Sequence, residues 1–263
     1  MNVQINPVGA YLREWRQRRR LSQLDFALQA EISQRHLSFM ESGRATPSRD
    51  MLLRLAEHLG VPLRERNTWL LAAGYAPVFE ERKLDSPALH EARQAIDVLL
   101  KSTEPFPALV VDRGWNLVAA NAALQPLMSL VADSALLQPP INVMRLSLHP
   151  GGLASRVANL PEWRGHLLDR LFRQVNLTND RTLLPLLEEL RSYPSAESDA
   201  APQTDHGSIF VPFQLRTDQG LLSFFSTTTV FGTAVDITLA ELTLESFFPA
   251  NPETAAALRA LPG

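Results

Sequence analysis

The segment from Leu21 to Pro47, LSQLDFALQAEISQRHLSFMESGRATP, constrains the fold of this chain more than any other. Ser22 and Ser33 each stand before an apolar periodic run, where a serine hydroxyl can accept a backbone N–H of the first helical turn. A glutamine follows each serine and therefore lies at a helix N-terminus. Two short helices joined by a tight turn, the second with polar residues at its start, are the plan of a DNA-reading helix-turn-helix.

Helical spacing of apolar residues continues on both sides of this segment. It predicts a helix over residues 7–20 and further helices over 48–59 and 62–74, and Gly43 is placed to end the second helix of the motif in a left-handed conformation. The side chains expected to face the common core from the two motif helices are Leu24, Ala27, Leu28, Leu37 and Met40. Together these patterns predict a compact all-α, five-helix domain over residues 1–75.

Composition limits the class of protein. Hydrophobic residues make up 45% of the 263 residues and charged residues 20%, as in a globular chain with a core. The chain has no cysteine, so disulfides and thiolate metal sites are excluded. The N-terminus lacks the apolar stretch of a signal peptide, and no apolar run approaches the roughly 18 residues that span a bilayer. We therefore expect a cytoplasmic protein that does not enter a membrane.

Charge is distributed unevenly along the chain. Residues 1–83 contain 13 Lys and Arg against 9 Asp and Glu, whereas the rest contains 12 against 19, within an overall net charge of −3. A basic first part followed by an acidic remainder indicates that the first domain meets a polyanion.

The remainder of the chain reads as an α+β domain. Residues 76–104 are predicted to form a linker and a connecting helix, after which residues 105–263 form the second domain. Two short β-type runs flank Arg113-Gly114 and predict a hairpin. The runs over residues 209–215, 221–231 and 235–244 predict a three-stranded antiparallel meander. With flanking helices, this gives an antiparallel sheet of about five strands.

Two stretches resemble known families. Residues 8–73 resemble the lambda-repressor-like (XRE-family) helix-turn-helix domain, through Leu21-Ser22-Gln23, Ile32-Ser33, Glu41-x-Gly43-Arg44 and Pro47-Ser48 among other matches. Glu31 replaces the glycine usual in the turn between the two helices, and a non-glycine residue with positive φ costs about 1 kcal/mol. In that family the residue at Glu41 pairs with an arginine of the first helix, which here points to Arg13.

Residues 106–248 resemble the MmyB-like, PAS-like ligand-binding domain of such regulators. The match rests on the run from Pro107 to Asn116, on Asn142-x-x-Arg145-Leu146, on Trp163, and on the segments from Leu222 to Thr227 and from Glu245 to Pro249. This resemblance implies a bacterial transcription regulator whose second domain holds a small apolar ligand such as a fatty acid.

The motif assigns DNA contacts to particular residues. The terminal amide of Gln34 can bond adenine N6 and N7 together, and we expect it to read a base. Gln23 is expected to hold a phosphate and to support Gln34. The full predicted DNA-binding set is Gln23, Ser33, Gln34, Arg35, Ser38, Arg44 and Thr46.

Aromatic residues suggest a ligand cavity in the second domain. A carboxylate ligand would need a cation or a hydroxyl, for which Arg145, His149 and Thr227 are candidates. The predicted ligand-binding set is Trp115, Arg145, His149, Trp163, Phe172, Phe213, Phe224 and Thr227.

Enzyme and metal sites are not indicated. The six histidines include no HxxxH or HxH pair, and the chain has no GxSxG, P-loop or GxGxxG motif. We expect no catalytic residue, no metal and no cofactor beyond the apolar ligand. The expected partners are double-stranded DNA with a palindromic operator, that ligand, and a second copy of the chain. A protein-interaction or antitoxin-like module with a degenerate helix-turn-helix and no ligand remains the alternative.

Overall fold

The computed structural model describes residues 7–194 and 210–260, and within it the chain divides into two compact units. The first unit holds the chain up to Arg82, and the second holds most of the remainder. The helices of the first unit are α1 (Pro7–Arg18), α2 (Gln23–Gln29), α3 (Gln34–Glu41), α4 (Arg49–His58) and α5 (Leu63–Ala72). The predicted five-helix domain is therefore confirmed.

Serine caps begin three of these helices. The hydroxyls of Ser22 and Ser33 each accept the N–H three residues later at 3.1 Å, and Ser48 does so at 3.3 Å. Gly43 follows α3 with φ of 74°, as predicted. Glu31 also adopts a left-handed conformation, with φ of 55°, so the turn between α2 and α3 keeps its path without a glycine.

Two residues of α2 were assigned to the wrong face. Leu24 and Leu28 were predicted to face the core, but they are 52% and 68% exposed. The buried residues of this seven-residue helix are Phe26 and Ala27, and its capping residue Ala30 is buried as well. A helix of two turns offers too few residues for periodicity alone to choose between neighbouring faces.

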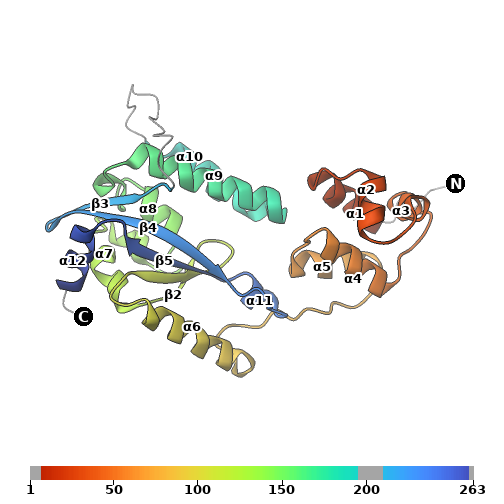
Figure 1. The fold of residues 1–263 in the computed structure, drawn as a ribbon, viewed down its shortest axis with the longest axis horizontal. Coiled ribbons are helices and arrows are strands. Elements are labelled where there is room, and N and C mark those ends of the chain that lie inside the picture. Colours follow the sequence, from red (N-terminus) through yellow and green to blue (C-terminus); the bar gives the residue numbers. More distant parts are fainter. Residues whose placement is uncertain (1–6, 195–209, 261–263) are drawn as a thin grey trace. The chain divides into compact units, whose positions relative to one another are not determined.

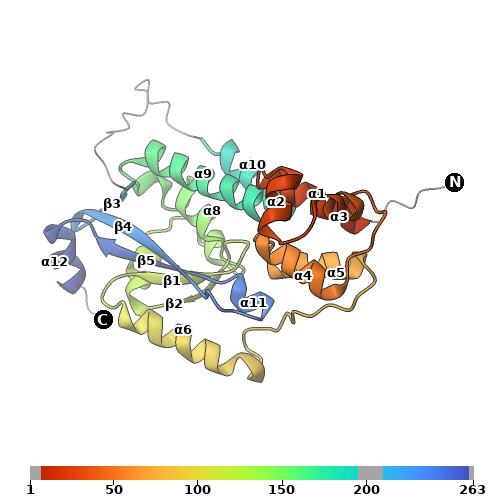
Figure 2. The ribbon, with the colours of Figure 1, turned by 45° about the vertical axis from the view of Figure 1, so that its right-hand side comes forward.

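The second unit is built on one antiparallel sheet (Figures 1 and 2). Its strands are β1 (Ala108–Val111), β2 (Leu117–Ala120), β3 (Phe213–Thr217), β4 (Gly220–Val230) and β5 (Thr243–Pro249), in the spatial order β2-β1-β5-β4-β3. The predicted meander is thus present as β3-β4-β5, and the predicted hairpin β1-β2 joins it through β1 and β5.

The last strand lies later in the sequence than predicted. Residues 235–244 were expected to form it, but a short helix α11 (Ile237–Ala240) occupies that stretch, and β5 begins at Thr243. The apolar run of β5 fills the centre of the sheet between β1 and β4, a place that only long-range pairing selects. The predicted start of the meander, residue 209, lies outside the described residues.

Helices cover both faces of the sheet. The helix α6 (His90–Ser102) packs Ile96 and Leu100 against Ala108 and Val110 on one face. The other helices are α7 (Gln125–Met128), α8 (Val143–Leu148), α9 (Leu160–Thr178), α10 (Leu184–Ser192) and α12 (Pro252–Ala260). Figures 1 and 2 show α8, α9 and α10 over the opposite face from α6. The largest core cluster lies between these helices and the sheet.

Candidate DNA-binding surface and ligand cavity

A buried carboxylate joins the three helices around the helix-turn-helix motif. Glu41 on α3 accepts hydrogen bonds from Arg16 Nε on α1 at 2.6 Å and Arg16 Nη2 at 2.9 Å, and from Gln23 Nε2 on α2 at 2.8 Å. Glu41 and Arg16 are only 5% and 8% exposed. A bidentate charge-assisted pair in this position fixes the angle between α1 and α3.

Two arginines of α1 pair with Glu41, and the sequence indicated one of them. The predicted pair with Arg13 is present: its Nε lies 3.5 Å from the Glu41 carboxylate, its Nη2 donates to the Glu41 carbonyl at 3.4 Å, and its side chain is half exposed. Arg16 lies one helical turn further along α1, on the same side, and makes the buried bidentate contact. Spacing along α1 places both arginines near α3, so only tertiary packing distinguishes them.

The surroundings of Glu41 lower its pKa. Burial alone would raise the pKa of this carboxyl, but hydrogen bonds from Arg16 and Gln23 and the charges of Arg16 and Arg13 outweigh it, so the pKa falls below its ordinary value of 4.5.

We expect the contribution of Glu41 to stability to depend on pH in one direction. A depressed carboxyl pKa stabilises the folded state above the unfolded-state pKa, and that stabilisation is lost as the pH falls through the folded-state pKa. Urea unfolding of the protein and of Glu41→Gln should therefore show a large difference in stability at neutral pH that narrows below about pH 4. If the difference in stability between the two proteins stayed constant over this pH range, the pKa of Glu41 would not be lowered in the folded state.

The first turn of α3 presents the predicted base-reading residues to solvent. Gln34 and Arg35 are exposed, and the N-capping Ser33 is exposed beside them. In the loop after α3, Arg44 and Thr46 are exposed as well. The guanidinium groups of Arg35 and Arg44 lie over the ring of Phe39, at 5.3 and 5.8 Å from its centre. Phe39 thus holds two cations near the start and the end of the same helix.

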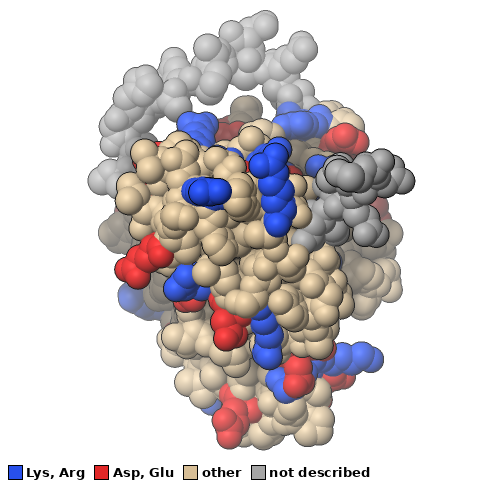
Figure 3. Space-filling model, turned by 90° about the vertical axis from the view of Figure 1, so that its right-hand side faces the viewer, with Lys and Arg blue, Asp and Glu red and all other residues tan. Residues whose placement is uncertain are grey.

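The other two predicted DNA contacts are less accessible. Ser38 and Gln23 are partly buried. Gln23 was expected to support Gln34, but its side-chain amide donates to Glu41 instead. On the face that Figure 3 shows, basic side chains are spread among uncharged ones, with acidic side chains between them, so the basic residues of this face do not form one continuous block.

The second unit contains an apolar cavity of about 90 Å³, lined by residues of the sheet and of the helices α8 and α9. Its polar lining residues are Ser147, Arg170, Ser226 and Glu245. Its apolar lining consists of Leu109, Trp115, Leu124, Leu127, Met128, Val143, Met144, Leu146, Leu153, Trp163, Leu167, Phe213 and Phe247. A mostly apolar wall with a few polar groups is characteristic of a small-molecule site.

Three of the predicted ligand-binding residues line this cavity, namely Trp115, Trp163 and Phe213. Phe224 lies fully buried next to Phe213, with ring centres 6.1 Å apart, and forms part of the core behind the cavity wall. Phe172, on α9, is 47% exposed and does not line the cavity.

The predicted polar ligands lie elsewhere. The guanidinium of Arg145 forms a bidentate pair with Glu189 on α10, at 2.8 and 2.7 Å. The ring of His149 packs edge-on against Tyr193, and Thr227 points from β4 to the exposed side. None of these three lines the cavity. Helix and strand periodicity does not show which partner a long polar side chain reaches.

Sequence reasoning missed the charged pair in the cavity wall. Arg170 lies on the apolar stripe of α9 that also carries Trp163 and Leu167, and Glu245 interrupts the apolar run of β5. A charge at a core-facing position is rare unless it is paired. Each of these two interruptions was visible in the sequence, but nothing in the sequence showed that they meet.

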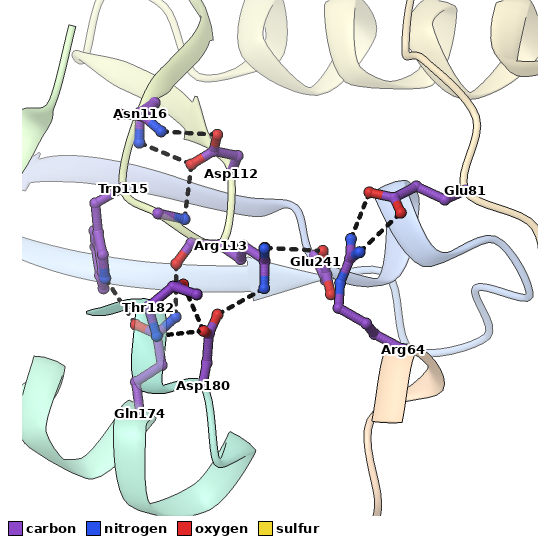
Figure 4. A network of polar contacts seen from close by, with 11 residues as sticks. Arg64, Glu81, Asp112, Arg113, Trp115, Asn116, Gln174, Asp180, Thr182 and Glu241 are labelled. Carbon is purple, nitrogen blue, oxygen red and sulfur yellow. Dashed lines mark hydrogen bonds and ion pairs between the residues drawn. The ribbon is translucent and has the colours of Figure 1, made fainter. Parts of the chain in front are cut away.

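The turn between β1 and β2 positions Trp115 (Figure 4). Trp115 has φ of 65°, a left-handed conformation that is unfavourable for a bulky residue. Asp112 supports the turn by accepting the N–H groups of Gly114 at 2.8 Å and Asn116 at 2.9 Å. The indole Nε1 of Trp115 donates to Gln174 on α9 at 2.7 Å. The strained turn and the hydrogen bond to α9 together hold the indole against the cavity.

The described residues contain no cluster of three or more His, Cys, Asp or Glu side chains that could hold a metal ion. Among the helices described, none is both long and apolar enough to cross a membrane.

Known protein families match both the helix-turn-helix unit and the unit that contains the cavity. The helix-turn-helix family matches residues 12–66, which begin within α1, include α2, α3 and α4, and end within α5. The MmyB-like transcription regulator ligand binding domain matches residues 92–261, more than half of the chain, and includes the whole cavity. No curated protein matches the chain. The chain is a DNA-binding transcription regulator, and it belongs to the MmyB-like transcription regulator family.

Proposed function

We propose that a small apolar ligand in the cavity of the second unit controls the binding of a homodimer to a palindromic operator. The observation that carries this proposal is the apolar cavity between the sheet and α8 and α9, inside the matched ligand-binding domain. On the DNA side, Gln34 reads a base, while Arg44 and Thr46 hold phosphates. In a dimer, two copies of α3 lie about 34 Å apart, one DNA turn.

The size of the cavity suggests how a ligand could act. Sites for drug-sized ligands have volumes of roughly 300–1,000 Å³, and this cavity measures about 90 Å³. A long fatty acid would therefore fit only if α8 and α9 moved away from the sheet. A ligand regulates only when its affinity differs between two conformations, and such a movement supplies a second conformation.

The test combines recovery of the ligand with DNA binding. Small molecules that co-purify with the full-length protein are identified by mass spectrometry, and a gel shift on the upstream region of its own gene is run before and after they are removed. Straight-chain fatty acids and alcohols of increasing length are then added back. We expect removal to change the affinity for DNA and addition to restore it. Affinity that is the same in all three conditions would disprove ligand control while leaving DNA binding intact.

Replacing Arg44 with alanine should weaken specific and non-specific DNA binding by a similar factor. Its exposed guanidinium lies in the loop after α3, where a phosphate contact is expected and a base contact is not. Loss of one phosphate contact should reduce the slope of log K against log salt by about 0.9. Fluorescence anisotropy with operator and unrelated DNA at several salt concentrations measures both effects. If only operator binding weakened, Arg44 would be a base reader.

A further inference from the structure

The cavity wall contains two charged side chains, and they neutralise each other. Arg170 reaches the cavity from α9, and Glu245 reaches it from β5. No other Asp, Glu, Lys, Arg or His among the described residues lines the cavity. A ligand that enters therefore meets a wall without net charge.

The guanidinium of Arg170 is already engaged on several sides. Nη1 donates to Glu245 Oε2 at 3.0 Å, and Nη2 donates to Thr228 Oγ1 at 2.9 Å and also to Glu245 Oε1. One face of the guanidinium lies 4.7 Å from the centre of the Trp115 ring. A ligand carboxylate could take the bidentate position on Arg170 only by displacing Glu245.

Displacing Glu245 would be strongly unfavourable. Its side chain is 4% exposed, and the strand pairing places it between Leu109 on β1 and Thr228 on β4. Its other hydrogen bond comes from Thr228 Oγ1 at 3.1 Å. Separated from Arg170, this carboxylate would be a buried charge without a counterion, the costly outcome when a buried ion pair is broken. A second carboxylate beside it would add repulsion between like charges.

The cavity does offer hydrogen bonds to an uncharged group. Ser226 lines it from β4, and its hydroxyl makes no side-chain hydrogen bond with any described residue. Ser147 lines it from α8, and its oxygen accepts the indole N–H of Trp163 at 2.8 Å. A hydroxyl, ester, lactone or amide oxygen can bond to Ser226 without disturbing the ion pair, because a hydroxyl both donates and accepts.

We propose that the Arg170–Glu245 pair makes this cavity selective for an uncharged ligand, a small alkyl or aryl body with one neutral oxygen group at Ser226, and that it rejects carboxylates. This inference rests on the proposed function, since it names the chemical class of the ligand in the same cavity. The cavity of about 90 Å³ is smaller than the roughly 150 Å³ that holds a benzene ring, so it favours a compact ligand, and a six-carbon probe requires its walls to move slightly apart.

The test compares two probes of equal chain length, n-hexanol and hexanoate, by isothermal titration calorimetry with the full-length protein at neutral pH. We expect n-hexanol to bind at least about tenfold more tightly than hexanoate. Equal affinity, or tighter binding of hexanoate, would overturn the selectivity while leaving a ligand cavity in place. Binding of neither probe would overturn this selectivity, whereas the proposed function is decided separately by the co-purifying molecule and its effect in the gel shift.

Two variants test whether the Arg170–Glu245 pair causes the preference for the uncharged probe. Glu245→Gln leaves Arg170 without its counterion, so hexanoate should gain about tenfold or more in affinity while n-hexanol changes little. The matched control, Glu189→Gln, opens the Arg145 pair outside the cavity and should leave the ratio of the two probes unchanged. An unchanged ratio in Glu245→Gln would overturn the role of the pair.

Ser226→Ala tests the neutral contact and does not disturb the ion pair. It should lower the affinity for n-hexanol several-fold. The affinity for toluene, which has no hydrogen-bonding group, should stay unchanged. Unchanged n-hexanol binding would overturn the assignment to Ser226. Should Glu245→Gln fail to fold, the native probe ratio and Ser226→Ala still decide the proposal.

Discussion

Replacing Glu41 with alanine is expected to lower the free energy of unfolding of the helix-turn-helix unit by about 3–5 kcal/mol. The substitution leaves Arg16, which is 8% exposed, as a buried cation without its carboxylate, and it removes the acceptor of Gln23. Both losses act at the junction of α1, α2 and α3. Urea denaturation of the full-length protein, followed by helical circular dichroism, measures the effect.

Glu14→Ala is the matched control for this prediction. Glu14 pairs with Arg18 one turn away on α1, and both side chains are partly exposed. An exposed pair of this spacing contributes about 0.3–0.5 kcal/mol. Similar losses in the two variants would show that the Glu41 contacts do not hold the three helices together. Glu41→Gln, which keeps one acceptor oxygen, should fall between them.

Replacing Gln34 with alanine should weaken binding to the operator by about 1–3 kcal/mol and relax the preference at one base pair. Gln34 is exposed at the first turn of α3, where a terminal amide can bond both N6 and N7 of an adenine. The measurement is a binding-site logo, from selection on randomised DNA, for the native protein and the variant.

The neighbouring variant Gln29→Ala serves as a control, since Gln29 is an exposed glutamine at the end of α2. It should leave the logo unchanged. A logo that is equally unchanged in Gln34→Ala would remove Gln34 from the base-reading set, and Arg35 would be the next residue to test.

Local signals predicted the elements of the first unit well. Ser22, Ser33 and Ser48 cap their helices, and Gly43 ends α3, because a cap depends on neighbouring backbone atoms. The same signals could not choose the buried face of a short helix, so Leu24 and Leu28 were misplaced. The choice of face depends on what packs against the helix, and that information is not local.

Sequence patterns could predict the position of some candidate residues, and their roles stay predictions. Gln34 and Arg44 are exposed, and Trp115, Trp163 and Phe213 line one cavity. Arg145 and His149 do not reach that cavity, since Arg145 pairs with Glu189 and His149 packs against Tyr193. A polar side chain pairs with whatever charge the fold brings near, often from a distant segment.

The sequence by itself determined the five helices and the helix-turn-helix of the first unit, with serine caps on three of these helices, and it determined an α+β domain with a five-stranded antiparallel sheet for the second unit. Only the tertiary structure decided that Arg16 holds Glu41, and that Arg170 and Glu245 meet in the cavity wall. The physical reason is the distance along the chain over which each kind of interaction acts. Caps and periodicity act within a few residues, whereas each of these ion pairs joins side chains on separate elements that become neighbours only when the core packs.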